Sequence, residues 1–298
     1  MNTHQNKILS NFIITVVLFL GLETLSVLIG LNQIWEFLSV AWYLFAFQVI
    51  WIAFMFDLHL KDSRPVSLAS VQFRHILRDA FVQRLRHFGN FQYLRHFANY
   101  YVLPTILFWS AAALLFLNPF RPELKQVVIL ISAFAFCLNF AHMHEHLSRK
   151  LSANSAWLRI LSVAKLLVAY EAYAGIIGIC WYFAYPTKVV FWLTVAVTFF
   201  LMHQALFAHG FQKSRVYLFA IIFALFSGLI GVWAFHNWTY QYLTAALILL
   251  ALYNTVWGFM HHYLEKTFTS KIALEYLVLG LLVVSIILAT HNFAAQVI

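Results

Sequence analysis

The sequence predicts an all-α fold, a polytopic bundle of about nine transmembrane helices. Of its 298 residues, 63% are hydrophobic and only 10% are charged, whereas an average soluble domain is roughly 45–50% apolar and about 25% charged. A surface in water needs charge, so the composition excludes an ordinary soluble enzyme and a disordered chain. The apolar residues occur in continuous runs and do not alternate with polar ones, which indicates helices because only helices and closed barrels span lipid.

Nine apolar stretches are separated by short polar segments. Most reach the roughly 20 residues that cross a bilayer, and 126–142 lies at the short end of the range. The first stretch has only Lys7 before it and no small-residue cleavage pattern after it, so we expect a retained span and not a signal peptide. We expect residues 1–298 to form a single integral membrane domain. The stretches are 11–31, 34–56, 99–118, 126–142, 157–183, 188–208, 216–235, 241–261 and 272–290.

The basic residues predict the orientation of the chain. Lys and Arg together number 19, against 10 for Asp and Glu. If the N-terminus is cytoplasmic, the outer side holds only Arg121, Lys125 and Lys188, and nearly all other basic residues fall inside. The positive-inside rule therefore favours a cytoplasmic N-terminus, and we expect the bacterial inner (plasma) membrane. Topology explains the basic excess, so no nucleic-acid partner is expected.

The segment 57–98 is the only sizeable predicted loop, and it lies on the cytoplasmic side. Its second half carries apolar residues at helical spacing, with arginines mostly elsewhere around the helix. This pattern predicts an amphipathic interfacial helix that contacts anionic membrane lipid. The apolar residues are Phe73, Leu77, Phe81, Leu85 and Phe88.

More than half of the 14 histidines fall at the predicted cytoplasmic ends of the even-numbered spans. Imidazole is the commonest protein ligand for iron, zinc, copper and nickel, and facing helices of a bundle can bring several together. A single histidine at a membrane interface is ordinary, but this accumulation at one depth indicates a metal site. These residues are His59, His142, His144, His146, His203, His209, His261 and His262.

Spacing selects the candidate ligands. His142 and His146 share a helical face with Glu145 beside them, and His261 shares a face with Glu265. The expected metal ligands are His142, His146, His203, His209, His261 and His262. We expect one or two iron ions, with zinc or another transition metal as alternatives.

His203 and His209 are six residues apart, about 120° off alignment on a helix. Both serve one site only if the helix ends or bends between them. Gly210 makes a helix end in this region plausible.

Three glutamates are the predicted catalytic carboxylates. Glu145 and Glu265 neighbour the histidine clusters and either orient a ligand or bind the metal themselves. Glu171 lies near the middle of the fifth span. Burying a carboxylate there costs roughly 2.5–3.5 kcal/mol, so a partner or a role is expected, and Lys165 is a candidate partner. An interhelical hydrogen bond and a proton relay are the two interpretations.

The histidine clusters resemble those of the integral-membrane non-heme iron enzymes, which include fatty-acid desaturases and hydroxylases and bacterial carotene-cleaving dioxygenases. The pair His142 and His146 is similar to the spaced pair of the first desaturase histidine box, and His261-His262 to the end of the HxxHH boxes. Gly258 and Phe259 stand where those boxes carry a further histidine, and the second HxxHH box is absent. The resemblance implies metal-bound oxygen acting on a lipophilic substrate.

These observations lead to a membrane metalloenzyme that oxidises a lipid or isoprenoid substrate, as a non-heme metal-dependent oxidoreductase. One alternative is a proton- or ion-coupled transporter or channel with Glu171 in the pathway and histidines that titrate near neutral pH. Such a protein would have discontinuous helices and internal repeats. A further alternative is a b-type heme protein with two axial histidines from facing helices.

Overall fold

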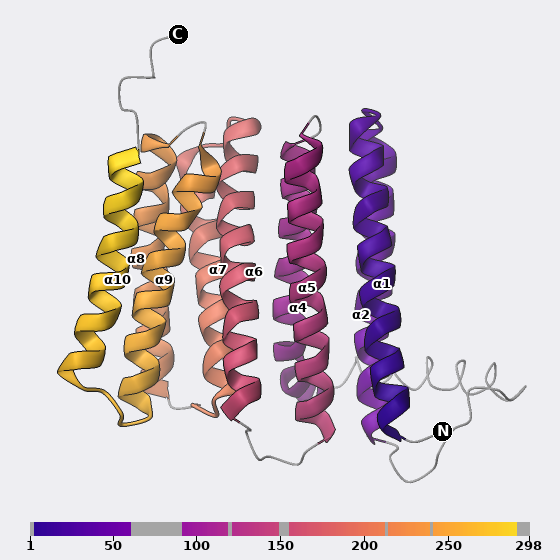
Figure 1. The fold of residues 1–298 in the computed structure, drawn as a ribbon, viewed down its shortest axis with the longest axis horizontal. Coiled ribbons are helices and arrows are strands. Elements are labelled where there is room, and N and C mark those ends of the chain that lie inside the picture. The colour runs from indigo at the N-terminus through magenta and orange to yellow at the C-terminus, as the bar shows by residue number, and fades with distance from the viewer. Residues whose placement is uncertain are drawn as a thin grey trace, which may run out of the picture. The chain divides into compact units, whose positions relative to one another are not determined.

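The computed structural model describes residues 3–60, 91–118, 121–148, 155–211, 214–238 and 241–290, whose regular secondary structure is entirely helical (Figure 1). All nine helices in these ranges are long and apolar enough to cross a membrane, which confirms the predicted all-α fold of about nine spans. The helices are α1 Thr3–Gly30, α2 Ile34–Leu60, α4 Phe91–Leu117, α5 Pro122–Ser148, α6 Ser155–Tyr182, α7 Thr187–Ala208, α8 Ser214–Asn237, α9 Tyr242–Leu264 and α10 Ser270–Thr290.

Several helices extend past the apolar stretch that predicts them. The stretch 126–142 lies within α5, which has 27 residues and begins with Pro122 and Glu123 in its first turn. Proline suits the first helical position because its missing N–H has no partner there, and an acidic residue complements the helix dipole. The two ends of the predicted loop 57–98 likewise belong to α2 and α4. Residues 61–90, which contain the predicted interfacial helix, lie outside the described ranges.

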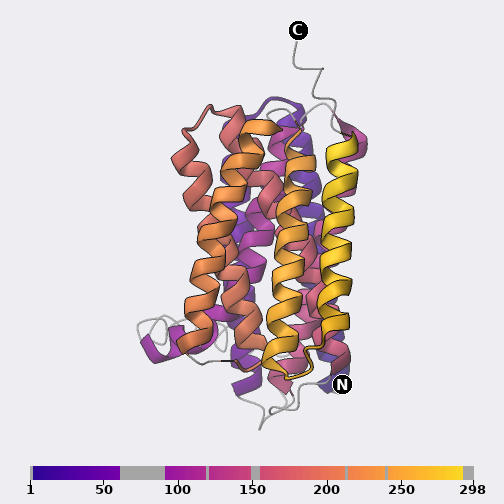
Figure 2. The same cartoon turned by 90° about the vertical axis from the view of Figure 1, so that its left-hand side faces the viewer.

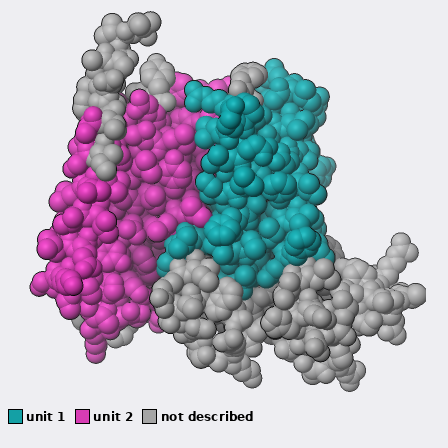
Figure 3. Space-filling view, viewed as in Figure 1, with its two compact units in different colours: residues 1–108, 119–164 teal, residues 109–118, 165–298 magenta. Residues whose placement is uncertain are grey.

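The chain divides into two compact units, coloured separately in Figure 3. Unit 1 comprises residues 1–108 and 119–164, and unit 2 comprises residues 109–118 and 165–298. The single membrane domain 1–298 stays a prediction.

Unit 1 is built on α1, which packs against α2 and α5. Gly21 permits the close approach of α2, since a Cβ atom there would lie 2.7 Å from the Leu44 side chain. Near the C-terminal end of α1, Gln126 Nε2 donates to Glu23 Oε2 at 3.1 Å. Lys125 Nζ donates to the Ser26 carbonyl oxygen at 3.1 Å. The Glu23 carboxylate therefore has an interhelical partner.

Unit 2 contains α7, α8, α9 and α10, each packed against its neighbour in sequence, as Figure 2 shows for α8, α9 and α10. Tyr173 Oη and Thr198 Oγ1 lie 3.0 Å apart and join α6 to α7. Exposed leucines cover the outer faces, as at Leu229 of α8 and Leu281 of α10, each 61% exposed. Apolar side chains this exposed are unfavourable in water and suit contact with lipid.

Candidate metal centre

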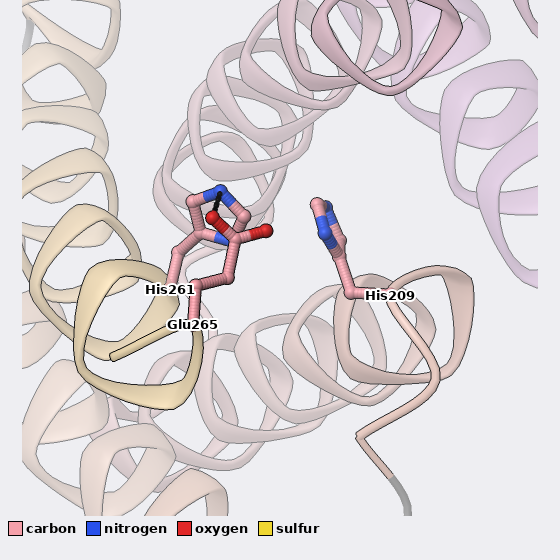
Figure 4. Close-up of side chains that lie close together, drawn as sticks. All are labelled: His209, His261 and Glu265. Carbon is pink, nitrogen blue, oxygen red and sulfur yellow. Dashed lines mark ion pairs between the residues drawn. The ribbon is translucent and has the colours of Figure 1, made fainter. Parts of the chain in front are cut away.

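Two histidines and one glutamate of unit 2 converge at the C-terminal ends of α7 and α9. One ligand atom each from His209, His261 and Glu265 lies within 4.8 Å of the others (Figure 4). Metal–nitrogen and metal–oxygen bonds are about 2.0–2.2 Å long, so a shift of the order of 1 Å would let all three bind one ion. Among the residues that the structure describes, no other group of His, Cys, Asp and Glu meets this spacing.

The end of α7 places His209. Gly210 has φ +74°, the left-handed conformation that suits glycine and ends a helix. Phe211 N donates to the Leu206 carbonyl at 2.9 Å, and Gly210 N donates to the Phe207 carbonyl at 3.0 Å. These two bonds form a Schellman motif, so His209 is the C-cap residue and its ring leaves the helix where the chain turns.

The end of α9 repeats this motif and places Glu265. Lys266 has φ +59°, Thr267 N donates to the His262 carbonyl at 2.9 Å, and Lys266 N donates to the Tyr263 carbonyl at 3.2 Å. Glu265 is the C-cap residue, one turn beyond His261. Its Oε2 lies 3.4 Å from His261 Nε2, which confirms the predicted alignment of this pair on one face.

The two helix ends and the Glu265 carboxylate favour a cation at this position. Both helices end here, so the partial negative charges of their terminal carbonyl groups converge, and Glu265 adds a formal negative charge. The side chains of His261 and Glu265 are 23% and 40% exposed. The group is therefore open on one side, as a metal site needs if it is to bind a further ligand.

Trp257 forms the inner wall of the group. Its ring is stacked with His261 at a centroid distance of 5.6 Å and lies 5.4 Å from the His209 ring. The His209 and His261 rings are 4.5 Å apart. Phe211 stacks with His209 at 6.0 Å. These contacts fix the two imidazole rings before any ion binds, which lowers the cost of ordering them.

Two predicted ligands of unit 2 point elsewhere. His203 packs between Phe199 and Tyr217, with its ring 5.3 Å from Tyr217 of α8. Helix α7 stays regular as far as Ala208 and His209 is its C-cap residue, so the two histidines keep the roughly 120° offset of a helix and point in different directions. His262 Nδ1 lies 2.9 Å from Thr267 Oγ1, and its ring is 5.9 Å from Tyr276 of α10. The structure does not bring these two residues into the group.

The remaining predicted residues fall in three places. His142 is buried on α5 in unit 1. Glu145 and His146 lie outside the residues whose side chains the structure describes. Glu171 is buried on α6. Of the predicted cluster, the described residues that lie together therefore come from the sixth and eighth spans, which are α7 and α9.

The sequence alone indicates Lys165 only as a candidate partner of Glu171, whereas the structure places it beside the candidate metal centre. Its side chain is 2% exposed, and its Nζ atom has no hydrogen-bond partner among the described residues. Its candidate partner Glu171 does not accept a hydrogen bond from Nζ, since a separation of six residues turns the two side chains to different faces of α6. Instead Nζ lies 5.7 Å from the centroid of the Trp257 ring. A basic residue within an apolar span indicated that Lys165 has a special environment. The sequence did not indicate that this environment is the Trp257 ring of α9.

The nine apolar helices of the described ranges define a polytopic α-helical membrane protein. The chain belongs to the DUF5656 family, described as protein of unknown function, which matches residues 23–290. The matched range includes His209, His261 and Glu265. No curated protein and no solved structure matches the chain.

Proposed function

We propose that the protein is a membrane metalloenzyme with a metal centre formed by His209, His261 and Glu265. The observation that carries this proposal is the convergence of three ligand atoms from two helices within 4.8 Å. Two imidazoles and one carboxylate with open positions are the donor set typical of non-heme iron(II) oxygenases. We therefore propose one iron(II) ion, with zinc as the alternative.

The reaction class follows from the donor set and the surroundings. When bound, the ion would supply Lewis-acid and oxygen-activating chemistry, with dioxygen as the oxidant. The protein would hold the ion, and Trp257 would shield its inner side from water. A substrate would enter from the lipid-facing side of the bundle, so we propose oxidation of a lipid or isoprenoid. The positive-inside distribution supports a site on the cytoplasmic side, and we propose the bacterial inner membrane.

The heme alternative is less well supported. Two axial imidazoles must lie on opposite faces of a macrocycle, whereas the His209 and His261 rings are 4.5 Å apart and both contact Trp257. A heme would have to displace these contacts.

One observation favours the transporter alternative. Glu171 is 2% exposed within the apolar span Ser162–Tyr182. The helix α6 that carries it is continuous from Ser155 to Tyr182, without the interruption expected at a substrate site of many transporters.

Metal analysis of protein purified in detergent and reloaded with iron(II) without oxygen tests the proposal. We expect about one tightly bound ion per chain in the wild type, and at least tenfold weaker binding in His261→Ala. The matched control is His262→Ala, which removes the adjacent imidazole from the same helix and should retain the ion. Substoichiometric metal in the wild type, or equal retention in both variants, would contradict the proposal.

A further inference from the structure

Lys165 is a buried amine that has no ion-pair or hydrogen-bond partner among the described residues. Its side chain is 2% exposed within the membrane span Ser162–Tyr182. No described residue accepts a hydrogen bond from its Nζ atom. The face of the Trp257 ring is its visible contact. A cation–π contact replaces only part of the hydration that an ammonium group loses on burial, and no described residue offers an acceptor to the N–H donors of Lys165.

Trp257 connects this ammonium group to the proposed metal centre. The same indole ring that lies 5.7 Å from Lys165 Nζ lies 5.6 Å from His261 and 5.4 Å from His209. A metal ion beside an unneutralised ammonium group would be repelled by it. A negatively charged ligand at Lys165 would satisfy the amine and remove this repulsion.

We propose that Lys165 binds the carboxylate of a long-chain carboxylic acid beside the metal centre. This assignment names the substrate class of the proposed enzyme and rests on that proposed function for the reaction, although binding of the acid does not require the metal. The position of Lys165 within a span means that an anion reaches it from the membrane, as the head of an amphiphile. The apolar chain then lies among the aromatic and aliphatic side chains of the bundle.

A carboxylate fits this position better than a phosphate. Lys165 is a single point charge with three donors. Phosphate sites in proteins usually combine several donors, such as a bidentate arginine or the amide groups of a helix N-terminus. Lys165 lies more than two turns inside α6, which begins at Ser155, so its helix offers no free amide groups there.

The test uses a photoreactive long-chain acid and the full-length protein in phosphatidylcholine nanodiscs. Labelling is competed with palmitate, hexadecanol or phosphatidylglycerol. We expect palmitate to compete about tenfold better than the other two, the difference expected from one hydrogen bond to a charged group. Lys165→Met should weaken palmitate competition about tenfold, while Lys165→Arg retains it. Lys188→Met is the matched control, because it removes a lysine near the start of α7, and it should behave as wild type.

Several outcomes would overturn the inference. Equal competition by hexadecanol would show that charge is not recognised, and equal competition by phosphatidylglycerol would show that the site is not specific for carboxylate. These comparisons on the wild type need no variant to fold. Unchanged competition by palmitate in Lys165→Met would show that Lys165 does not bind the carboxylate.

Metal content measured on the same samples separates this inference from the proposed function. An acid that binds the metal-free protein through Lys165 supports the inference even if the metal centre fails its own test. If the protein binds iron(II) stoichiometrically but shows no preference for palmitate, the carboxylate proposal is wrong and the proposed metal centre is retained.

Discussion

His209 and His261 lie at the ends of two different helices, yet their imidazole rings meet at a centroid distance of 4.5 Å with an interplanar angle of 66°. Each of the two helices ends in a Schellman motif close to these residues. The Schellman motif after Ala208 ends α7 at the level where the same motif after Leu264 ends α9. Each motif makes a predicted site residue its C-cap, namely His209 in α7 and Glu265 in α9. The proposed centre is therefore a property of the helix ends.

Replacing Glu265 with glutamine should weaken metal binding by at least about tenfold, because the amide keeps the shape but loses the negative charge that neutralises the ion. Competition with a chromogenic chelator measures this change. Glu275→Gln on α10 is the control for loss of a nearby carboxylate. An unchanged affinity in Glu265→Gln would remove this residue from the ligand set.

His203→Ala should retain the ion, because the His203 ring packs against Phe199 and Tyr217 and not toward α9. The measurement is the metal-to-protein ratio after dialysis, compared with His209→Ala, which should lose the ion. These two variants remove the same side chain from the same helix. If both lost the ion, the geometric separation of the two histidines would be wrong.

Lys266→Gly should raise the free energy of unfolding by about 1 kcal/mol, because a side chain in the left-handed conformation is strained and glycine is not. Thermal denaturation in detergent reports the change. Ala184→Gly tests the same effect at a second position, since Ala184 has φ +50° in the corresponding motif that ends α6. Both variants should be stabilised while metal affinity stays unchanged. Destabilisation of both would contradict the assigned helix ends.

Gly258→Ala should destabilise the protein by about 1–3 kcal/mol, because the added methyl group would collide with the Tyr276 ring of α10. Gly175→Ala provides the comparison. Its Cβ would lie 3.3 Å from Ala113 Cβ, a milder contact that should cost less. The midpoint of thermal denaturation should therefore fall further in Gly258→Ala, and the reverse order would refute this packing of α9 against α10.

Glu171→Gln distinguishes the enzyme from the transporter. The metal content should equal that of the wild type, because Glu171 lies six residues beyond Lys165 along α6, a rise of about 9 Å. Proton flux into proteoliposomes, measured with a trapped pH indicator, should be absent in both proteins. A wild-type flux that the variant abolishes would favour the transporter alternative.

The helices of this protein were readable from local sequence. An apolar run of about 20 residues specifies a membrane helix by itself, because every backbone polar group in lipid must be satisfied within the segment. The stretch 188–208 accordingly falls within α7, and the stretch 241–261 begins one residue before α9. The i,i+4 pairing of His261 with Glu265 was also predictable, since it depends only on helical geometry.

Local sequence did not predict which residues form the candidate metal centre. Eight histidines share a predicted depth, but depth does not state which direction each side chain takes around its helix or which helix stands opposite. His209 faces α9 while His203 faces α8, and a side-chain contact between α6 and α9 sets Lys165 over Trp257. Spans and their periodicity are local and follow from hydropathy, whereas the meeting of His209, His261 and Glu265 depends on contacts between segments distant in sequence. Only the folded bundle decides those contacts.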